Sequence, residues 1–162
     1  MSATTAVTLA DLFDVDTLNG YVDSELVSRK EHPTLPLDIY TYTRRCQYDA
    51  RWDDVTMRCR GLVAERGTGL IVAWPLAKFF NYGEHATGKP YAPPLPDDEP
   101  FEVFDKLDGS LGILFRYDGE WRVASKGSFT SDQASWASGW LSTVDLPPVD
   151  GVTLLTEVLY AE

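Results

Sequence analysis

The segment 111–125 constrains the fold of this chain more than any other segment, because it predicts a β-hairpin. Its Asp118-Gly119 dipeptide is the strongest short turn signal that can separate two strands. The residues before this turn alternate between two faces, as they do in an extended strand. Lys106 precedes the first strand and Lys126 follows the second. The hairpin therefore predicts that two lysines lie at the same end of neighbouring strands.

The first of these lysines opens the run Lys106-Leu107-Asp108-Gly109-Ser110, after a strand-like apolar stretch at 101–104. A lysine held between two strands loses water and tends to lose its proton, and the free amine is a nucleophile. In an extended segment Asp108 projects to the same side as the lysine, and Gly109 permits a turn or the close approach of a ligand. These five residues alone fit a solvated lysine in an ordinary turn at least as well as they fit a nucleophile.

The first half of the chain predicts both helix and strand. Apolar residues follow helical spacing over 8–28, and prolines end that region. Residues 37–43 have the pattern of an extended segment. A second hairpin is predicted where 61–65 and 70–73 flank a Gly-containing turn at 66–69.

The last third of the chain predicts one helix and one further strand. Ser131 and the residue after it cap a helix that runs to about Thr143. Trp136 and Trp140 belong to the apolar stripe of this helix, and we interpret them as core residues rather than as platforms for stacking bases. A strand is expected over 152–160, where it lies at the edge of a sheet.

Four blocks, in this order and spacing, resemble the nucleotidyltransferase domain of ATP-dependent RNA ligases, above all the T-even phage RNA ligase 1 type. The resemblance covers roughly residues 35 to 160, and the extended segment 37–43 is similar to the family's approach to the first block. The blocks are Arg60-Gly61-Leu62-Val63, Trp74 to Glu84 with Lys78-Phe79-Phe80-Asn81 at its centre, Lys106-Leu107-Asp108-Gly109-Ser110, and Ser125-Lys126-Gly127-Ser128-Phe129.

The resemblance implies an α+β fold, namely an antiparallel-sheet nucleotidyltransferase domain of the ATP-grasp-like ligase adenylation type with peripheral helices. We expect one partial adenylyltransferase domain over 1–162, with a helical N-terminal region at 1–34 and a nucleotide-binding sheet region at 35–162. The family has two further motifs, a Glu-Gly run and a lysine pair, that do not occur in this sequence. We therefore expect a domain that is incomplete at its C-terminal side: a fragment, the product of a split or decayed gene, or one that a second chain completes.

The same resemblance implies a reaction. A lysine attacks the α-phosphate of ATP to give lysyl-AMP, AMP passes to an RNA 5′-phosphate, and a 3′-hydroxyl then displaces AMP to seal the strand. ATP and Mg²⁺ are the implied cofactors, RNA ends are the implied partners, and RNA repair or end joining is the implied role. The alternative is a catalytically inactive remnant, or a nucleotide- or partner-binding module that needs another chain. DNA ends or a cap as substrate come last, because the blocks match RNA ligases.

By resemblance, Lys106 is the nucleophile, Arg60 contacts a phosphate, Lys78 holds phosphates near the nucleophile, and Glu157 contacts the ribose. Arginine can grip phosphate oxygens with two N–H groups, lysine supplies a point charge, and nearby cations favour the free amine of Lys106. Glu157 lies in an apolar strand, where a buried carboxylate without a partner is costly, and this favours a paired or functional role. The bland alternatives are a surface arginine at position 60 and a lysine at position 78 whose stem covers apolar surface.

Further residues complete the predicted site. Tyr42 is a candidate aromatic beside the nucleotide, with Tyr40 an equally good alignment. Lys126 belongs to a family motif, and Asp108 and Gly109 support the nucleophile. No metal-ligating set is predicted, because the two cysteines lack ligand spacing and the two histidines are isolated.

The net charge of −11 argues against broad nucleic-acid binding, because affinity for nucleic acid comes largely from neutralised phosphates. The basic residues of the four blocks can still form a local cationic cleft, which suits a nucleotide better than a long RNA track. No apolar run approaches the ~20 residues that a membrane span needs. We expect a protein of the cytoplasm, in a bacterial or phage-infected host cell.

Overall fold

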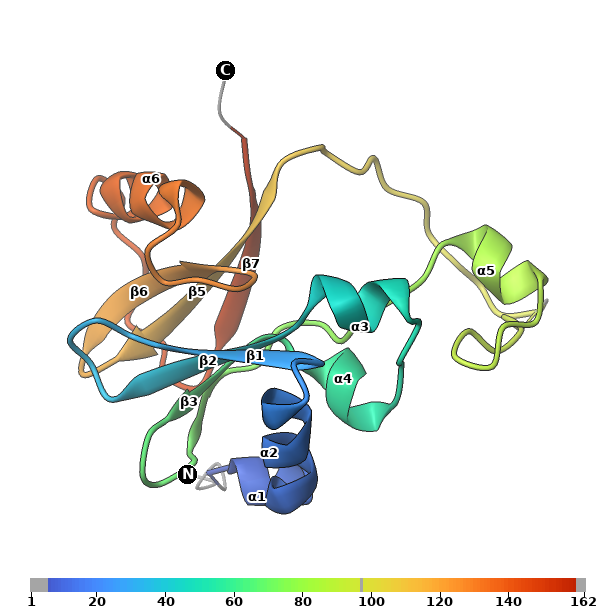
Figure 1. Ribbon diagram of the computed structural model, residues 1–162. Coiled ribbons are helices and arrows are strands. Elements are labelled where there is room, and N and C mark those ends of the chain that lie inside the picture. The colour runs from blue at the N-terminus through green and yellow to red at the C-terminus, as the bar shows by residue number, and fades with distance from the viewer. Residues whose placement is uncertain (1–5, 97, 160–162) are drawn as a thin grey trace.

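Two antiparallel sheets form the centre of the molecule in a computed structural model that describes residues 6–96 and 98–159 (Figure 1). The first sheet has the strand order β1-β2-β3-β4, and the second has the order β6-β5-β7. The strands of the first sheet are β1 (Val27–Glu31), β2 (Leu37–Tyr42), β3 (Arg60–Glu65) and β4 (Ile71–Ala73); those of the second are β5 (Ser110–Tyr117), β6 (Glu120–Ser125) and β7 (Thr153–Val158).

The two sheets share one hydrophobic core. Leu37 and Ile39 of β2 pack in the same buried cluster as Val63 of β3 and as Ile113 and Phe115 of β5. Because side chains alternate along a strand, the other face of β2 is free to contact the N-terminal helices. All six residues of β2 are buried, so this strand is the centre of the layered structure.

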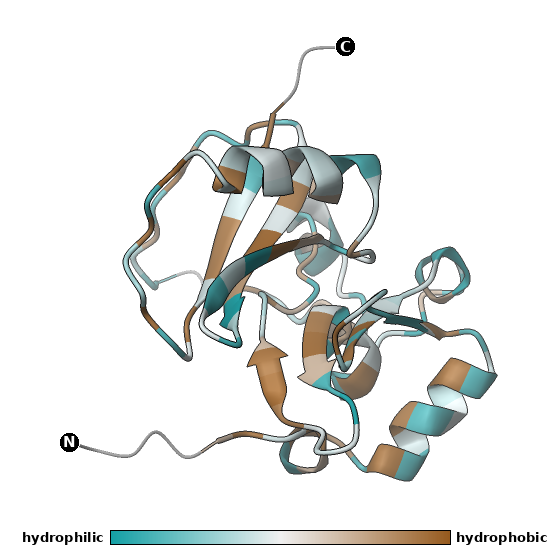
Figure 2. Cartoon of the chain, turned by 90° about the vertical axis from the view of Figure 1, so that its left-hand side faces the viewer, coloured by the Kyte–Doolittle hydropathy of each residue, from teal (hydrophilic) through white to brown (hydrophobic). Residues whose placement is uncertain are grey.

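Helices cover the outer faces of both sheets. Helices α1 (Leu9–Leu12) and α2 (Val15–Asp23) pack on the first sheet through a cluster that includes Leu18 and Leu62. Helix α6 (Asp132–Leu141) packs on the second sheet, where Ala137 joins a cluster with Leu114 and Val158; Figure 2 shows this helix at the top. The short helices are α3 (Arg44–Tyr48), α4 (Asp54–Arg58) and α5 (Tyr82–Ala86).

The two cysteines, Cys46 and Cys59, are buried free thiols. Burial raises the pKa of Cys59 to about 12, so its thiol stays protonated at neutral pH. In the part of the chain that the structure describes, no helix combines the length and apolar character that crossing a membrane requires.

The structure confirms the predicted mixture of helix and antiparallel sheet. The hairpin at 111–125 forms from β5 and β6, and its turn residues Asp118 and Gly119 both have positive φ, at 53° and 78°. The hairpin around 66–69 is present as β3 and β4, and Ser131 caps α6 through its side chain. The predicted strand at 152–160 is β7, although residue 160 lies outside the described residues. That this sheet is a nucleotidyltransferase domain stays a prediction.

The prediction of a helix over 8–28 is wrong at its C-terminal end. Helix α2 ends at Asp23, and Glu25 takes a left-handed backbone conformation with φ of 60°. The chain then enters β1, where Val27 pairs with Tyr42. Leu26 and Val27 satisfy helical spacing by coincidence, because a short apolar run fits either periodicity.

The strand-like stretch at 101–104 does not form a strand. Among the described residues, the backbone of 98–109 makes no backbone–backbone hydrogen bond, and Phe101, Val103 and Phe104 are 86%, 84% and 78% exposed. Strand propensity becomes a strand only when a neighbouring strand supplies hydrogen bonds and packing. In Figure 1 this segment arches away from the sheets before it enters β5.

The assignment of Trp136 and Trp140 to the core is also wrong. Both are exposed, at 50% and 42%, whereas the buried residues of α6 are Ala134 and Ala137. The small alanines bring the helix close to the sheet, and the two indoles are thereby left on the outer flank of the helix.

A buried carboxylate in β2 generates a stability prediction. Asp38 is only 2% exposed and accepts hydrogen bonds from Arg29, at 2.8 Å from Nε, and from Arg66, at 3.1 Å from Nε. We expect Asp38→Ala to lower the free energy of unfolding by about 2–3 kcal/mol, because two arginines lose their common partner. Glu31→Gln, which removes an exposed partner of Arg66, should change it by less than about 1 kcal/mol. Urea unfolding measures the stability of both variants, and equal losses would contradict the role of Asp38 as the buried partner of the two arginines.

A hydrogen bond between the two sheets generates a pH prediction. The Tyr117 hydroxyl donates to Glu65 at 2.6 Å, and this bond raises the pKa of Tyr117 to about 12. The unfolded chain ionises this tyrosine near pH 10, so the stabilisation is present below about pH 10 and is lost as the pH rises to about 12. We expect unfolding midpoints measured from pH 9 to 12 to fall less steeply in Tyr117→Phe than in the wild type. Identical slopes would show that the bond does not contribute.

Candidate functional site

A cavity of about 1060 Å³ is a cleft that we call the central cleft. It brings together residues from both sheets, from the segment before β5 and from the start of α6. The predicted residues that line it are Arg60, Lys106, Gly109, Lys126 and Glu157; Phe79, Phe104, Asp105 and Gln133 are among the other lining residues.

The strand ends explain why these residues meet. Arg60 is the first residue of β3, and Lys126 follows the last residue of β6. β5 pairs with β6 on one side and with β7 on the other, where Leu111 lies opposite Glu157. The predicted proximity of the two hairpin lysines is therefore found, since both line the same cleft.

Two glycines allow the walls of the central cleft to approach closely. A Cβ atom on Gly61, which has φ of 90°, would overlap the side chain of Ile113 and lie 3.1 Å from the carbonyl oxygen of Lys126. A Cβ atom on Gly109 would lie 2.5 Å from the carbonyl oxygen of Val158. Real Cβ atoms essentially never lie within 3.0 Å of backbone atoms, so packing requires glycine at position 109. At position 61 the positive φ favours glycine in addition to the close contacts.

Lys106 is exposed, and its Nζ donates a hydrogen bond to the carbonyl oxygen of Leu107 at 3.2 Å. The expectation that two strands desolvate it is wrong, because residues 101–104 form no strand. Asp108 is exposed and does not line the cleft.

Arg60 and Lys126 each rest on an aromatic ring. The guanidinium of Arg60 lies 5.1 Å from the centre of the Phe79 ring, and Nζ of Lys126 lies 4.8 Å from the centre of the Tyr42 ring. The same Nζ is 3.5 Å from the Tyr42 hydroxyl. Tyr42 is thus buried beneath a cleft lysine rather than exposed in the cleft, and cation–π attraction orients both cations.

Lys78 lies outside the lining of the central cleft. Its ammonium lies 4.1 Å from the centre of the Phe80 ring and 5.5 Å from that of Trp52, and it donates to the carbonyl oxygen of Phe79. Tyr42 also packs edge-on against Trp52, with ring centres 5.0 Å apart. The structure therefore places Lys78 in an aromatic cluster, and its predicted contact with phosphate requires the side chain to turn.

The cations of the central cleft are not held in ion pairs among the described residues, although carboxylates line the same cleft. Arg60, Lys106 and Lys126 form no ion pair with any described residue. Two carboxylates, Asp105 and Glu157, line the same cleft. Glu157 is exposed, so the argument that burial makes it functional is wrong. Such a cleft can accept a polyanion with phosphates against the cations.

A protein-only metal cage is absent from residues 6–96 and 98–159, where no three His, Cys, Asp or Glu side chains come together. The two cleft carboxylates offer oxygen ligands of the kind that Mg²⁺ prefers. Mg²⁺ commonly binds through one or two carboxylates together with substrate phosphates. The cleft therefore fits a magnesium ion that arrives with a phosphate ligand.

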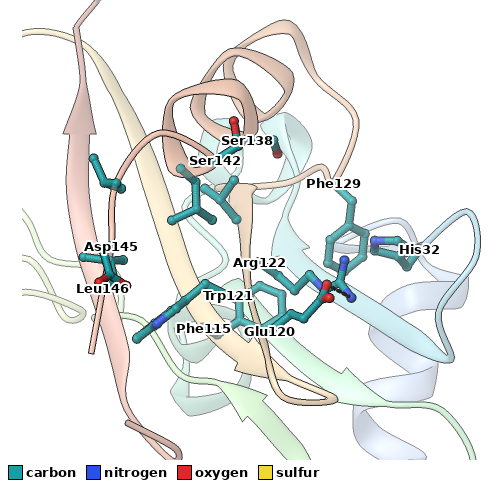
Figure 3. A pocket seen from close by; sticks show the side chains of 13 residues that line it. His32, Phe115, Glu120, Trp121, Arg122, Phe129, Ser138, Ser142, Asp145 and Leu146 are labelled. Atoms are coloured by element: carbon teal, nitrogen blue, oxygen red, sulfur yellow. Dashed lines mark ion pairs between the residues drawn. The ribbon is translucent and has the colours of Figure 1, made fainter. Parts of the chain in front are cut away.

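A second cavity of about 490 Å³ lies between β6 and the C-terminal end of α6 (Figure 3). Glu120 and Arg122 form an ion pair of 2.9 Å there, and His32 tilts against Phe129 with ring centres 4.8 Å apart. Burial, together with the charge of Arg122, lowers the pKa of His32. None of the predicted site residues lines this cavity.

Sequence reasoning missed several lining residues of the central cleft. Phe79 lies inside the quoted Lys78-Phe79-Phe80-Asn81 block, so the block itself was a signal for it. Asp105 directly precedes the lysine and could have been named with it. Gln133 has no motif around it and reaches the cleft only because α6 starts there.

A sequence profile of the RNA ligase family matches residues 58–151, which include Arg60, Lys78, Lys106 and Lys126. A protein of Autographa californica nuclear polyhedrosis virus, named for polynucleotide kinase and RNA ligase activities, is 30% identical over 106 residues. This match covers 60% of the chain and 14% of the relative. An RNA ligase of Rhodothermus phage RM378 is 25% identical over 125 residues, which cover 66% of the chain and 28% of the relative. The chain thus spans less than a third of either curated relative.

The close contact at Gly109 generates a test of the site's packing. Gly109→Ala should lower the free energy of unfolding by about 1–3 kcal/mol, because the new methyl group meets the backbone of β7. The matched control is Gly20→Ala in α2, where nothing lies within 4 Å of the added Cβ; it should stabilise the protein by about 0.5–1 kcal/mol. Urea unfolding of both variants gives the comparison. A neutral Gly109→Ala would mean that β7 does not approach this residue in solution.

Proposed function

Because the chain belongs to the T4-type RNA ligase family, we propose that its central cleft carries out the adenylyl-transfer half of RNA ligation. The observation that carries the proposal is the meeting of Lys106, Arg60, Lys126 and Glu157 in one cleft. These residues come from four separate segments of the sequence. If Lys106 were an ordinary surface lysine in a turn, there would be no reason for the other three predicted residues to line the same cleft.

Lys106 is the proposed nucleophile. Its amine, in the uncharged form, attacks the α-phosphorus of ATP; a P–N bond forms, the bond to the bridging oxygen breaks, and pyrophosphate leaves. The amine proton passes to solvent, which is available because Lys106 is exposed. The product is lysyl-AMP on residue 106.

The cations of the cleft supply positioning and charge. Arg60 can hold phosphate oxygens with two N–H groups, and Lys126 adds a point charge. Cation–π contacts with Phe79 and Tyr42 orient these two cations before the ligand binds. Reactions at phosphorus depend largely on such positioning and charge stabilisation. Lys78 joins them in this proposal only when it leaves its aromatic cluster.

The acidic residues of the cleft have separate proposed roles. Glu157 accepts hydrogen bonds from the ribose hydroxyls, which an exposed carboxylate on the edge strand β7 can reach. Asp105 lies next to the nucleophile and can hold Mg²⁺ together with the ATP phosphates. When bound, the ion neutralises phosphate oxygens and assists departure of pyrophosphate.

RNA ends are the proposed second substrate. A 5′-phosphate oxygen attacks the phosphorus of lysyl-AMP and releases Lys106, which leaves AMP on the RNA end. A 3′-hydroxyl then attacks the RNA 5′-phosphate, and AMP departs as the strand is sealed. Because the chain spans only part of its relatives, residues outside it can contribute to these later steps.

Transfer of label from ATP tests the first step. The chain is incubated with Mg²⁺ and α-labelled ATP, and label is measured on the denatured protein. We expect the label to resist detergent and alkali and to be released by acid, as a P–N bond requires. Lys106→Ala and Lys106→Arg should both lose more than about 100-fold of the labelling, because neither retains the amine nucleophile.

The matched control is Lys89→Ala, which removes an exposed lysine that does not line the cleft and should label as the wild type does. Circular dichroism establishes that every variant is folded. A folded wild-type chain that takes up no label, but binds ATP in calorimetry, would replace the catalytic proposal with the nucleotide-binding alternative. Equal labelling of Lys106→Arg would reject Lys106 as the nucleophile.

A further inference from the structure

Helix α6 carries two indole rings that are partly exposed at its surface. Trp136 and Trp140 are half exposed, and neither indole has a ring contact, a cation contact or a hydrogen bond with a described residue. Trp52, by contrast, packs against two aromatic rings, and the indole N–H of Trp121 donates to a carbonyl oxygen at 3.2 Å. Two neighbouring indoles left open to water indicate a surface that binds something.

The position of these rings ties them to the central cleft. Gln133, Trp136 and Trp140 follow one another at intervals of three and four residues, so they lie on one stripe of the helix. Gln133 lines the central cleft. At about 1.5 Å per residue, Trp136 lies ~5 Å and Trp140 ~10 Å beyond it along the helix axis. The stripe therefore begins at the proposed reaction site and leads away from it.

The surroundings of the two rings favour flat ligands over a protein partner. The helix residues between them, Ala137, Ser138 and Gly139, are small and cannot cover an indole face. A protein interface usually buries such rings within a contiguous packed patch, whereas this flank supplies serine and glycine around them. A nucleobase needs only a ring face, and stacking on an aromatic side chain contributes about 1–3 kcal/mol per base.

The charge around α6 determines which part of a nucleic acid this surface can hold. No Lys or Arg occurs after Lys126 in the sequence, and Asp132 lies at the start of the helix. The nearby Arg122, which lines the cavity at the C-terminal end of α6, is paired with Glu120. Phosphates therefore gain little from this surface, and contact through the bases remains. The cations of the central cleft, at the other end of the stripe, supply the phosphate contacts.

We propose that Trp136 and Trp140 stack on unpaired bases of the RNA strand whose end occupies the central cleft, an inference that rests on the proposed function. The cleft holds the terminal phosphate through Arg60 and Lys126, and α6 holds the bases that follow. Stacking of this kind tolerates any sequence, because every base has a ring face. The phosphate contact is electrostatic and depends on salt concentration, whereas the stacking contact depends on the presence of bases. Varying the salt and removing the bases therefore tests each contact separately.

Equilibrium binding of a 5′-phosphorylated ten-nucleotide RNA, labelled with a fluorophore at its 3′ end, tests the inference by anisotropy from 50 to 200 mM salt. The double variant Trp136→Ala/Trp140→Ala should bind about 10- to 100-fold more weakly, with an unchanged salt slope. Lys126→Ala should reduce the slope of log affinity against log salt concentration by about one, because one phosphate contact is lost. An RNA of the same length without bases should bind the wild type and the double variant equally, because the stacking partner is gone.

Two control variants isolate the ring faces. Trp136→Phe/Trp140→Phe keeps flat rings and should retain most of the affinity. Trp74→Ala removes an indole of similar exposure, 41%, that lies neither on α6 nor in the cleft lining, and it should bind as the wild type does. Labelling of Lys106 by ATP should be unchanged in the double alanine variant. The labelling assay therefore tests the adenylylation proposal, and the RNA-binding assay tests base stacking.

Three outcomes would overturn the inference. The first is equal binding of base-containing RNA by the wild type and the double alanine variant. The second is a wild type that does not bind the RNA at all, whatever its labelling by ATP. The third is a concentration-dependent dimer, seen by sedimentation, that the double alanine variant abolishes, since α6 would then be a contact between copies of the chain.

Discussion

The packing of the two sheets against each other determines where the cations at the strand ends, Arg60 and Lys126, lie. Their common core joins β2 and β3 of one sheet to β5 of the other, and Gly61 lies close to Ile113 and to the backbone of Lys126. Arg60 is the first residue of β3 in the first sheet, and Lys126 directly follows β6 of the second. A shift of one sheet relative to the other would separate these cations. The site is therefore a property of the core between the sheets as much as of the residues that line it.

Short sequence motifs predicted the structure correctly where interactions between residues close in sequence determine it. The Asp118-Gly119 turn and the Ser131 cap are such cases, and both are found. Contacts between distant segments decided the failures. Residues 101–104 have strand propensity and no partner strand, and Trp136 has an apolar side chain on the flank of α6 that faces away from the sheet. The family motifs named most of the cleft residues, but they did not indicate that Lys78 lies among aromatic rings.

Ion pairing divides the basic residues of this acidic chain into two groups. Arg29 and Arg66 share Asp38 beneath the first sheet, and Arg122 pairs with Glu120. The cations of the central cleft have no carboxylate partner among the described residues. A polyanion that enters this cleft consequently displaces no internal ion pair. A net charge of −11 thus coexists with a cleft suited to phosphate.

The backbone of residues 98–109, which carries Lys106, makes no backbone–backbone hydrogen bond among the described residues. Fixing one residue in a single backbone conformation costs about 1–2 kcal/mol of conformational entropy. A ligand that holds Lys106 in one reactive position must offset this loss over several residues at once. Part of its contact free energy is then absorbed by ordering the segment, so measured affinity understates the strength of the contacts. Weak binding and accurate alignment of the nucleophile are compatible in such a site.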